Sequence, residues 1–257
     1  MQGTWDPDQY HRFRAQRAQP FHDLLALVRP KPAMRVADLG CGTGELSQHL
    51  HRSLQARETL GLDTSAEMLA RSQSLEATGL EFMQRDLRDV VQLGGFNLVF
   101  SNAALQWLPD HPTLLGELSS VLEAGGQLAI QMPANHDHVS HTVAREVAAE
   151  SPFVDALRGY RRDASVLPVE RYAELLHALG FVDQRAELRV YGHLLDCAAE
   201  VVEWVRGTLL LDYLGRLPGA LHEPFVARYR DRLLDEIGTG GPYFYAFKRI
   251  LLWGRRP

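Results

Sequence analysis

A short apolar segment that runs directly into three closely spaced glycines most constrains the fold of this chain. Residues 36–44 read VADLGCGTG, which predicts a buried strand followed by a tight turn and a helix. A second apolar segment, residues 59–63, ends in Asp63. A glycine turn lets the backbone approach a ligand, and a carboxylate at the next strand end accepts hydrogen bonds from ribose hydroxyls. The pair indicates an α/β protein that binds a nucleoside-bearing cofactor.

The spacing of the glycines limits which cofactor this turn can hold. A dinucleotide fingerprint needs a third glycine where helix meets strand, but the two possible positions hold Glu45 and Ser47. Glu45 would also place a negative charge in the first helical turn, where it would repel a pyrophosphate. No Gly-Lys-Ser/Thr sequence follows the turn, which excludes a P-loop.

Composition argues against several classes of function. The 257 residues are 46% hydrophobic and 23% charged with a net charge of −5, which is typical of one large globular domain. Lysine occurs only at positions 31 and 248 and there is no basic run, so we expect no nucleic-acid partner.

Residues 1–17 lack a secretory apolar core, and no apolar run is long enough to cross a bilayer. The two cysteines, Cys41 and Cys197, form neither a disulfide framework nor a metal-like spacing. We expect a cytoplasmic enzyme that does not bind a membrane.

Apolar strands alternate with helices along the first half of the chain. The expected strands cover residues 35–39, 59–63, 80–84, 96–101 and 127–132, and the expected helices residues 21–28, 45–53, 66–75 and 111–122. We expect Pro20 to open the first helix, and Gly125 with Gly126 to close the last one. This order predicts an α/β fold with a Rossmann-like, doubly wound sheet whose strands are mostly parallel.

The second half of the chain departs from this rhythm. Helices are predicted at 138–150 and 169–179, a long strand at 181–194, a leucine-rich helical block at 197–237 and a final strand at 243–253. The pattern indicates a seven-stranded sheet with an antiparallel last strand and a helical cap. We interpret residues 1–257 as one domain. Its helical lid would come from residues 1–20, about 135–178 and 197–240.

Polar side chains mark the ends of the later strands, where an open α/β sheet forms its ligand crevice. Asn102 and Trp107 follow the fourth strand and are candidate ligand contacts. Packing of the Trp107 indole against the next helix would explain this tryptophan equally well. Three histidines and one aspartate lie within residues 136–141, but without a helical zinc pattern they favour a polar loop, and we predict no metal. His193 is either a substrate ligand or a core histidine. Arg249 lies in an apolar strand and needs an anion partner, from the protein or from a substrate.

The segment from Asp38 to Gly44 resembles motif I of the class I S-adenosylmethionine-dependent methyltransferases. In that family the turn cradles the methionine part of the cofactor, and Asp38 would lie near its ammonium group. Asp63 matches the acid that binds the ribose, and Asp86 the acid that meets the adenine amino group. The resemblance implies S-adenosyl-L-methionine as cofactor and S-adenosyl-L-homocysteine as product. The residues implied to bind it are Asp38, Gly40, Cys41, Gly42, Gly44, Asp63, Thr64, Met68, Asp86, Leu87, Asn102, Ala103 and Trp107.

Motifs spread over nearly the whole chain are similar to those of the trans-aconitate 2-methyltransferases. They include Trp5-Asp6-Pro7, Asn102-Ala103-x-Leu105-Gln106-Trp107-Leu108-Pro109-Asp110-His111, Gln131-Met132-Pro133-x-Asn135, Tyr191-x-His193, Glu203-Trp204-Val205 and Phe247-x-Arg249. The resemblance implies methyl transfer to one carboxylate of trans-aconitate, or of a related small polycarboxylic acid, giving a monomethyl ester. It makes Arg17 and Arg249 candidate clamps for substrate carboxylates, and Tyr10, Gln131 and His193 further candidate substrate contacts.

This chemistry needs little from the protein beyond binding and alignment. A carboxylate is already ionised at neutral pH, and the sulfonium of the cofactor is already activated, so we predict no catalytic acid or base. Two alternatives stay open. One is another acceptor, such as a malonyl-carrier thioester or a quinone-like ring, for which the arginines within residues 158–162 would offer a basic rim. The other is a non-catalytic S-adenosylmethionine-binding protein. We expect a monomer or a homodimer.

Overall fold

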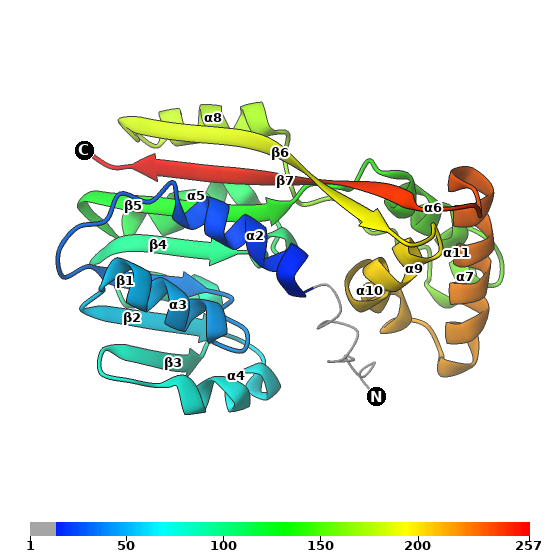
Figure 1. Ribbon diagram of the computed structural model, residues 1–257, viewed down its shortest axis with the longest axis horizontal. Helices are drawn as coiled ribbons and strands as arrows, with labels where there is room; N and C mark the ends of the chain where they lie inside the picture. The colour runs from blue at the N-terminus through cyan, green and yellow to red at the C-terminus, as the bar shows by residue number, and fades with distance from the viewer. Residues whose placement is uncertain (1–13) are drawn as a thin grey trace. The chain divides into compact units, whose positions relative to one another are not determined.

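The chain forms two compact units. The computed structural model describes residues 14–257 (Figure 1). The sheet unit contains residues 18–133, 165–189 and 249–257, and the helical unit contains, among the described residues, 14–17, 134–164 and 190–248. Each unit has its own cluster of buried apolar side chains.

Seven strands form one sheet in the described part of the chain. They are β1 (Arg35–Leu39), β2 (Glu58–Asp63), β3 (Leu80–Gln84), β4 (Phe96–Asn102), β5 (Leu122–Pro133), β6 (Asp183–Leu195) and β7 (Tyr243–Arg255). Their order is β3-β2-β1-β4-β5-β7-β6. The pairs among β1 to β5 are parallel and β7 is antiparallel to β5, which confirms the predicted Rossmann-like sheet. The strand order reverses between β1 and β4, and ligands of such sheets bind outside the strand ends at this point.

Helices cover both faces of the sheet. They are α2 (Arg14–Leu25), α3 (Glu45–Leu54), α4 (Ala66–Ser72), α5 (His111–Ser120) and α8 (Val169–Ala178). Helices α2 and α3 lie over one face, and α5 and α8 over the other (Figure 1). Phe21 of α2 and Leu50 of α3 pack in one core cluster with Phe100 of β4. Because β4 is covered on both faces, four of its consecutive residues, 98–101, are fully buried.

The helical unit has an aromatic core. Its helices are α6 (Val139–Ala148), α7 (Phe153–Ala156), α9 (Glu200–Val205), α10 (Leu211–Leu214) and α11 (His222–Ile237), with a π-helical turn at Arg206–Leu210. The rings of Phe153 and Phe225 meet edge to face with centroids 5.1 Å apart. Ion pairs between Arg232 on α11 and Glu146, 2.9 Å, and Glu150, 2.9 Å, join this helix to α6 and the turn after it. Packing of amphipathic helices around these rings forms the unit.

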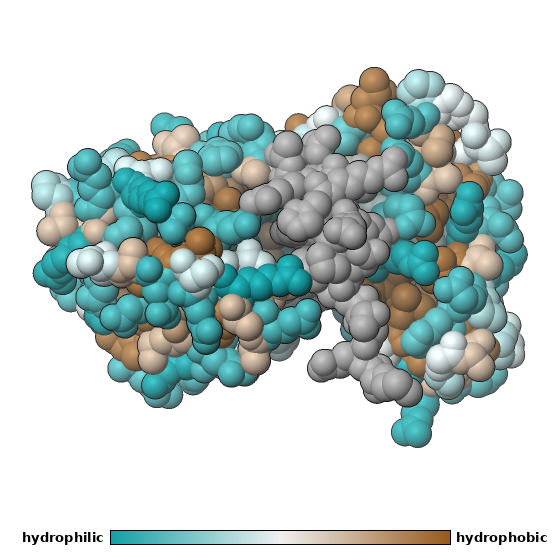
Figure 2. Space-filling model, turned by 60° about the horizontal axis from the view of Figure 1, so that its bottom comes forward, coloured by the Kyte–Doolittle hydropathy of each residue, from teal (hydrophilic) through white to brown (hydrophobic). Residues whose placement is uncertain are grey.

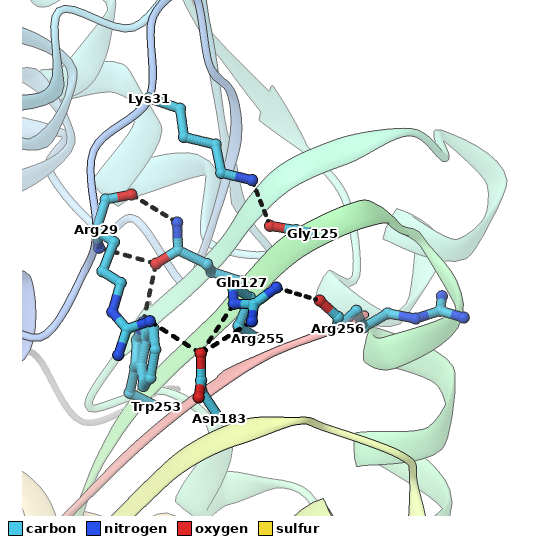
Figure 3. A network of polar contacts seen from close by, with 8 residues as sticks. All are labelled: Arg29, Lys31, Gly125, Gln127, Asp183, Trp253, Arg255 and Arg256. Carbon is cyan, nitrogen blue, oxygen red and sulfur yellow. Dashed lines mark hydrogen bonds and ion pairs between the residues drawn. The ribbon is translucent and has the colours of Figure 1, made fainter.

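A buried glutamine, Gln127, fixes the middle of β5 (Figure 3). The Gln127 side-chain oxygen accepts hydrogen bonds from Arg29 N at 2.8 Å and Trp253 Nε1 at 2.9 Å, and its nitrogen donates to Arg29 O at 2.7 Å. Arg29 and Arg255 both bind Asp183, each at 2.9 Å. The amide makes good hydrogen bonds at both ends, so its burial carries little desolvation cost.

Two predicted element boundaries are wrong. Pro20 does not open a helix, because it lies inside α2, which is helical from Arg14. Proline lacks an N–H and removes one intrahelical hydrogen bond, a loss that the burial of Phe21 and Leu24 offsets. Gly125 and Gly126 do not close α5, which ends at Ser120. They lie inside β5, where the pairing with β4 is irregular and the φ of Gly125 is 66°.

The surface is mostly hydrophilic, as expected from the composition of the chain. On the face shown in Figure 2, hydrophilic residues cover most of the described surface, with smaller hydrophobic areas between them. None of the helices between residues 14 and 257 combines the length and the apolar character that a membrane span needs.

Candidate active site

The glycine turn after β1 adopts a backbone that other residues resist. Gly40, Gly42 and Gly44 have φ angles of 75°, 57° and 77°, in the left-handed region. A Cβ on Gly40 would lie 2.2 Å from the Cβ of Ala104, and one on Gly44 would collide with Phe82. A Cβ on Gly42 would meet no atom within 4 Å. Two glycines are therefore needed for packing, while the third faces open space, as a ligand-binding turn requires.

Asp63 ties the end of β2 to this turn. Its Oδ2 accepts from Gly42 N at 2.9 Å, and its Oδ1 accepts from Ser65 N at 2.9 Å. Leu62 O accepts from the N–H groups of Gly40, 2.8 Å, and Cys41, 3.0 Å. The sequence predicted that Asp63 and the turn share a ligand. The structure adds that Asp63 also shapes the turn.

Asp38 is a buried carboxylate at the end of β1. It is 4% exposed, and the Ser47 hydroxyl donates to its Oδ2 at 2.5 Å. Burial raises the pKa of Asp38 to about 6, the Ser47 hydrogen bond opposes this rise, and the negative charge of Asp63 adds to it. No ion pair to Asp38 or Asp63 occurs among the described residues. Two neighbouring acids without a cation favour a positively charged ligand.

The third predicted acid, Asp86, already has a partner. It caps the short 3₁₀ helix at Leu87–Gln92, accepts from Arg88 N at 2.9 Å and pairs with the Arg88 guanidinium at 3.0 Å. The hydrogen bond from the Arg88 side chain lowers the pKa of Asp86. Leu87 beside it is buried. Asp86 therefore stays ionised, and an adenine amino group would share it with Arg88.

Two further residues follow β2. Met68 N donates to the Ser65 hydroxyl, 3.2 Å, which caps α4. The carbonyl oxygen of Thr64, whose side chain is exposed, accepts from the Gln84 amide at 3.1 Å. Thr64 and Met68 thus belong to the same loop and helix start as Asp63.

The segment after β4 reaches the same edge of the sheet. Ala103 N donates to Gln131 O at 2.9 Å, and Ala103 has a φ of 57°. Asn102 Oδ1 is buried without a hydrogen-bond partner among the described residues. The Trp107 side chain is 52% exposed. A buried acceptor without a donor costs stability, so Asn102 is a further position where a ligand donor would fit.

Arg249 and Gln131 meet at the end of the β5–β7 pair. Arg249 is 6% exposed and Gln131 is fully buried. The Arg249 Nη1 lies 3.5 Å from Gln131 Oε1. The structure therefore brings together two of the predicted substrate residues within the sheet unit. Tyr10 and the side chain of Arg17 lie outside the described residues.

His193 belongs to the helical unit. It is 7% exposed, and its ring stacks on Trp204 at a centroid distance of 4.5 Å and a 32° tilt. Both residues belong to motifs shared with the family, but the sequence predicts only His193 as a substrate contact. The stacking partner would have been hard to find, because Trp204 lies on another element, α9.

The histidine-rich loop forms a hydrogen-bonded cluster. The Ser140 hydroxyl lies 3.0 Å from His138 Nδ1, 3.1 Å from His141 Nδ1 and 3.3 Å from the Tyr245 hydroxyl. Burial lowers the pKa of His141 to about 3, and nearby Arg162 contributes. Within residues 14–257 no group of three or more His, Cys, Asp or Glu side chains could hold a metal. This cluster starts helix α6, with His138 as its N-cap.

Three contributions to the site were missed by the sequence analysis. Ser47 holds Asp38, Phe82 fills the space beside Gly44 and Gly61, and Ser101 Oγ donates to Leu39 O at 2.9 Å. Only Ser47 had a usable signal, since it lies in the first turns of the helix that follows the glycine turn. Burial and the charges of Asp38 and Asp63 raise the pKa of Cys41, which keeps it a neutral thiol, as expected of a turn residue rather than a nucleophile.

The Rossmann-like sheet, the glycine turn and the acids at the ends of β1 and β2 define a methyltransferase of the Rossmann-like class. A family model described as "Methyltransferase domain" matches residues 30–166. A Haemonchus contortus phosphoethanolamine N-methyltransferase, solved with S-adenosylhomocysteine, is 16% identical with a TM-score of 0.55; the match covers 93% of this chain and 52% of that chain.

Relatives with higher sequence identity identify one family within this class of methyltransferases. A trans-aconitate 2-methyltransferase of Deinococcus radiodurans is 45% identical over 260 residues, which cover 99% of each chain. One of Azoarcus sp. is 41% identical over 230 residues, or 88% of each chain. The chain belongs to the trans-aconitate 2-methyltransferase family, which confirms the predicted family and its S-adenosylmethionine-dependent activity.

Proposed function

We propose that this protein transfers the methyl group of S-adenosylmethionine to one carboxylate of trans-aconitate, or of a related small polycarboxylic acid, and releases a monomethyl ester. The observation that carries the choice of acceptor is the buried guanidinium of Arg249 beside the amide of Gln131. An arginine so deeply buried matches the planar, bidentate geometry of a carboxylate better than any neutral acceptor. The names of the relatives point to the same acid.

The residues at the strand ends fit a cationic nucleoside cofactor. Gly42 opens onto free space, Asn102 Oδ1 lacks a donor among the described residues, and Asp38 is a buried acid without an ion pair in the same range. We propose that Asp38 faces the ammonium group, Asp63 the ribose hydroxyls and Asp86 the adenine amino group. The turn residues Gly40, Cys41, Gly42 and Gly44, with Thr64, Met68, Leu87, Asn102, Ala103 and Trp107, would complete the cofactor site.

The proposed mechanism is alignment without proton transfer. When bound, the cofactor supplies an electrophilic methyl on a sulfonium. The acceptor carboxylate is ionised at neutral pH, so no side chain has to remove a proton. Arg249 and Gln131 hold the carboxylate, and Tyr10, Arg17 and His193 would contact the rest of the acid. Holding nucleophile and methyl in line supplies about 7–11 kcal/mol of the barrier.

The remaining proposals concern the whole protein. We propose that residues 1–20, about 135–178 and 197–240 act as the lid that excludes water from the reaction. We also propose a cytoplasmic monomer or homodimer without a nucleic-acid partner. The net charge of −5 and the lysine count of two support the last point.

One experiment separates the acceptors. The purified protein is incubated with methyl-labelled S-adenosylmethionine and, in separate reactions, di- and tricarboxylic acids including trans-aconitate, a malonyl-loaded carrier protein and a quinone-like ring. We expect label in a base-labile methyl ester of trans-aconitate. Label only on the carrier or the ring would replace the proposed acceptor. Cofactor binding without label on any acceptor would favour a non-catalytic protein.

A further inference from the structure

The segment that joins β4 to α5 has a left-handed backbone at both ends. The φ angle is 57° at Ala103 and 54° at Asp110. Residues other than glycine rarely adopt a left-handed backbone. They do so only where the surrounding structure holds them in it. The same segment carries Asn102, Ala103 and Trp107, which we assign to the cofactor. Contacts that hold this segment therefore bear on cofactor binding.

A buried histidine reaches this segment from the first position of α5. His111 is 2% exposed, and its Nε2 lies 3.0 Å from Leu105 O, in the middle of the segment. Its other ring nitrogen, Nδ1, makes a short contact with the hydroxyl of Tyr172. Tyr172 lies on α8 and is fully buried. The imidazole thus bridges the segment to a helix that follows it by some sixty residues in the chain.

The direction of each hydrogen bond in this bridge is determined. A carbonyl oxygen only accepts, so His111 Nε2 carries the proton and donates to Leu105 O. Nδ1 of a neutral imidazole is then an acceptor, and the Tyr172 hydroxyl donates to it. The hydroxyl oxygen in turn accepts from Leu167 N at 3.1 Å. Burial lowers the pKa of His111 and raises the pKa of Tyr172 to about 12, so both stay neutral.

We propose that His111 is a positioning residue for methyl transfer, which holds the Asn102–Trp107 segment in its cofactor-binding conformation by donating to Leu105 O while Tyr172 fixes its tautomer. The inference rests on the proposed function, since that function places the segment at the cofactor. His111 is the last residue of the motif that begins at Asn102.

Two substitutions at one position test the proposal. In His111→Gln the side-chain nitrogen occupies the position of the histidine Nε2 and can still donate to Leu105 O. In His111→Asn the side chain is shorter, so its amide occupies the position of Nδ1 and can contact only Tyr172. We expect His111→Asn to weaken S-adenosylhomocysteine binding roughly three- to tenfold in calorimetric titration. His111→Gln should stay within about twofold of the unchanged protein.

Tyr172→Phe tests the second half of the bridge. It should also weaken binding roughly threefold, and combining it with His111→Asn should add little, because both act through one bridge. Tyr229→Phe is the matched control: Tyr229 is equally buried and donates to Ser140 O at 2.9 Å in the helical unit. We expect that control to lower the unfolding temperature and leave binding unchanged.

A spectroscopic measurement reports the bridge directly. In ¹⁵N-histidine NMR spectra, the resonance pair lost in His111→Gln should show an Nε2–H tautomer, and Tyr172→Phe should shift its Nδ1 partner. An Nδ1–H tautomer, or equal binding by His111→Asn and His111→Gln when both are folded, would overturn the proposal. Failure of the proposed function looks different. In that case the unchanged protein methylates no acid, while the binding comparison can still be made with S-adenosylhomocysteine.

Discussion

The strand ends of the sheet unit and the histidine-rich loop of the helical unit use their polar groups in opposite ways. In the sheet unit, Asp38 and Asp63 accept hydrogen bonds from Ser47 and from backbone N–H groups, and no described residue forms an ion pair with either. In the helical unit, the Tyr245 hydroxyl accepts a hydrogen bond from the Asn135 amide and shares another with the Ser140 hydroxyl. The first arrangement leaves acceptor capacity and negative charge for a ligand. The second uses its capacity within the protein.

This difference separates binding from folding. A buried acid without a cation is costly by itself, and a charged ligand removes that cost. A mutually satisfied cluster gains nothing from a ligand and instead fixes a unique packing. Substitutions at the strand ends of the sheet unit should therefore change binding, whereas those in the cluster of the helical unit should change stability.

The largest effect is expected at Gly40. Gly40→Ala places a Cβ 2.2 Å from that of Ala104 in a left-handed backbone, so unfolding should become easier by roughly 2–5 kcal/mol. Cofactor binding should be lost with the turn. Gly180 has a φ of 81° and open space around its Cβ position. Gly180→Ala should cost only about 1–2 kcal/mol and leave cofactor affinity unchanged in calorimetry; similar effects at both glycines would contradict the packing argument.

Asp63 offers the next test. Asp63→Ala removes hydrogen bonds to a charged acceptor and should weaken cofactor binding by about 1.5–3 kcal/mol, roughly ten- to a hundredfold. It should also loosen the turn, because Gly42 N and Ser65 N lose their partner. Asp86→Ala is the comparison, since Arg88 already occupies that acid, and its effect should be smaller. Unchanged affinity in Asp63→Ala would remove Asp63 from the cofactor site.

Arg249 tests the acceptor side of the sheet unit. Arg249→Ala should raise KM for the acid roughly tenfold or more, with cofactor affinity nearly unchanged. Arg255→Ala lies on the same strand, but its side chain pairs with Asp183, so it should leave KM unaltered. Steady-state kinetics with trans-aconitate measure both. A normal KM in folded Arg249→Ala would exclude this side chain as a substrate clamp.

The acids of the sheet unit also predict a pH dependence. The pKa of Asp38 is about 6 in the folded protein, above its unfolded value of 3.8. The folded state therefore holds this proton more tightly, and the resulting stability is present below pH 4 and lost as the pH rises through 6. A cationic cofactor needs the ionised form, so its affinity should fall up to about tenfold per pH unit below the pKa.

Titrations of the cofactor between pH 5 and pH 8, in buffers of different ionisation enthalpy, measure this effect as proton release. Ser47→Ala removes the hydrogen bond that lowers the pKa of Asp38, so the affinity loss should begin at a higher pH. Asp38→Asn should bind weakly with no pH dependence from this group. A slope that survives in Asp38→Asn would assign the titration to another residue.

The smallest effect belongs to the helical unit. Tyr245→Phe removes a hydroxyl that contacts Ser140 and Asn135, and should cost about 1 kcal/mol of stability. Thermal unfolding measures this loss, and cofactor affinity should not change. If binding changed and stability did not, the contrast between the two units would be wrong.

The local sequence determined most of the sheet unit. The strand into a glycine turn and the acid that ends β2 each depend on residues within a few positions, so the pattern alone predicted them. It also identified the family, and it predicted the acids that we propose for the cofactor site. It failed at Pro20 and at Gly125, because in both places packing against distant residues outweighed a local preference.

Only the tertiary structure decided which residues support the site. Phe82 beside Gly44 and the contact of Tyr172 with His111 join residues far apart in the chain. Hydrogen-bond partners and burial depend on how strands and helices come together in space. The types of these residues are known from the sequence, but which of them come into contact depends on the fold.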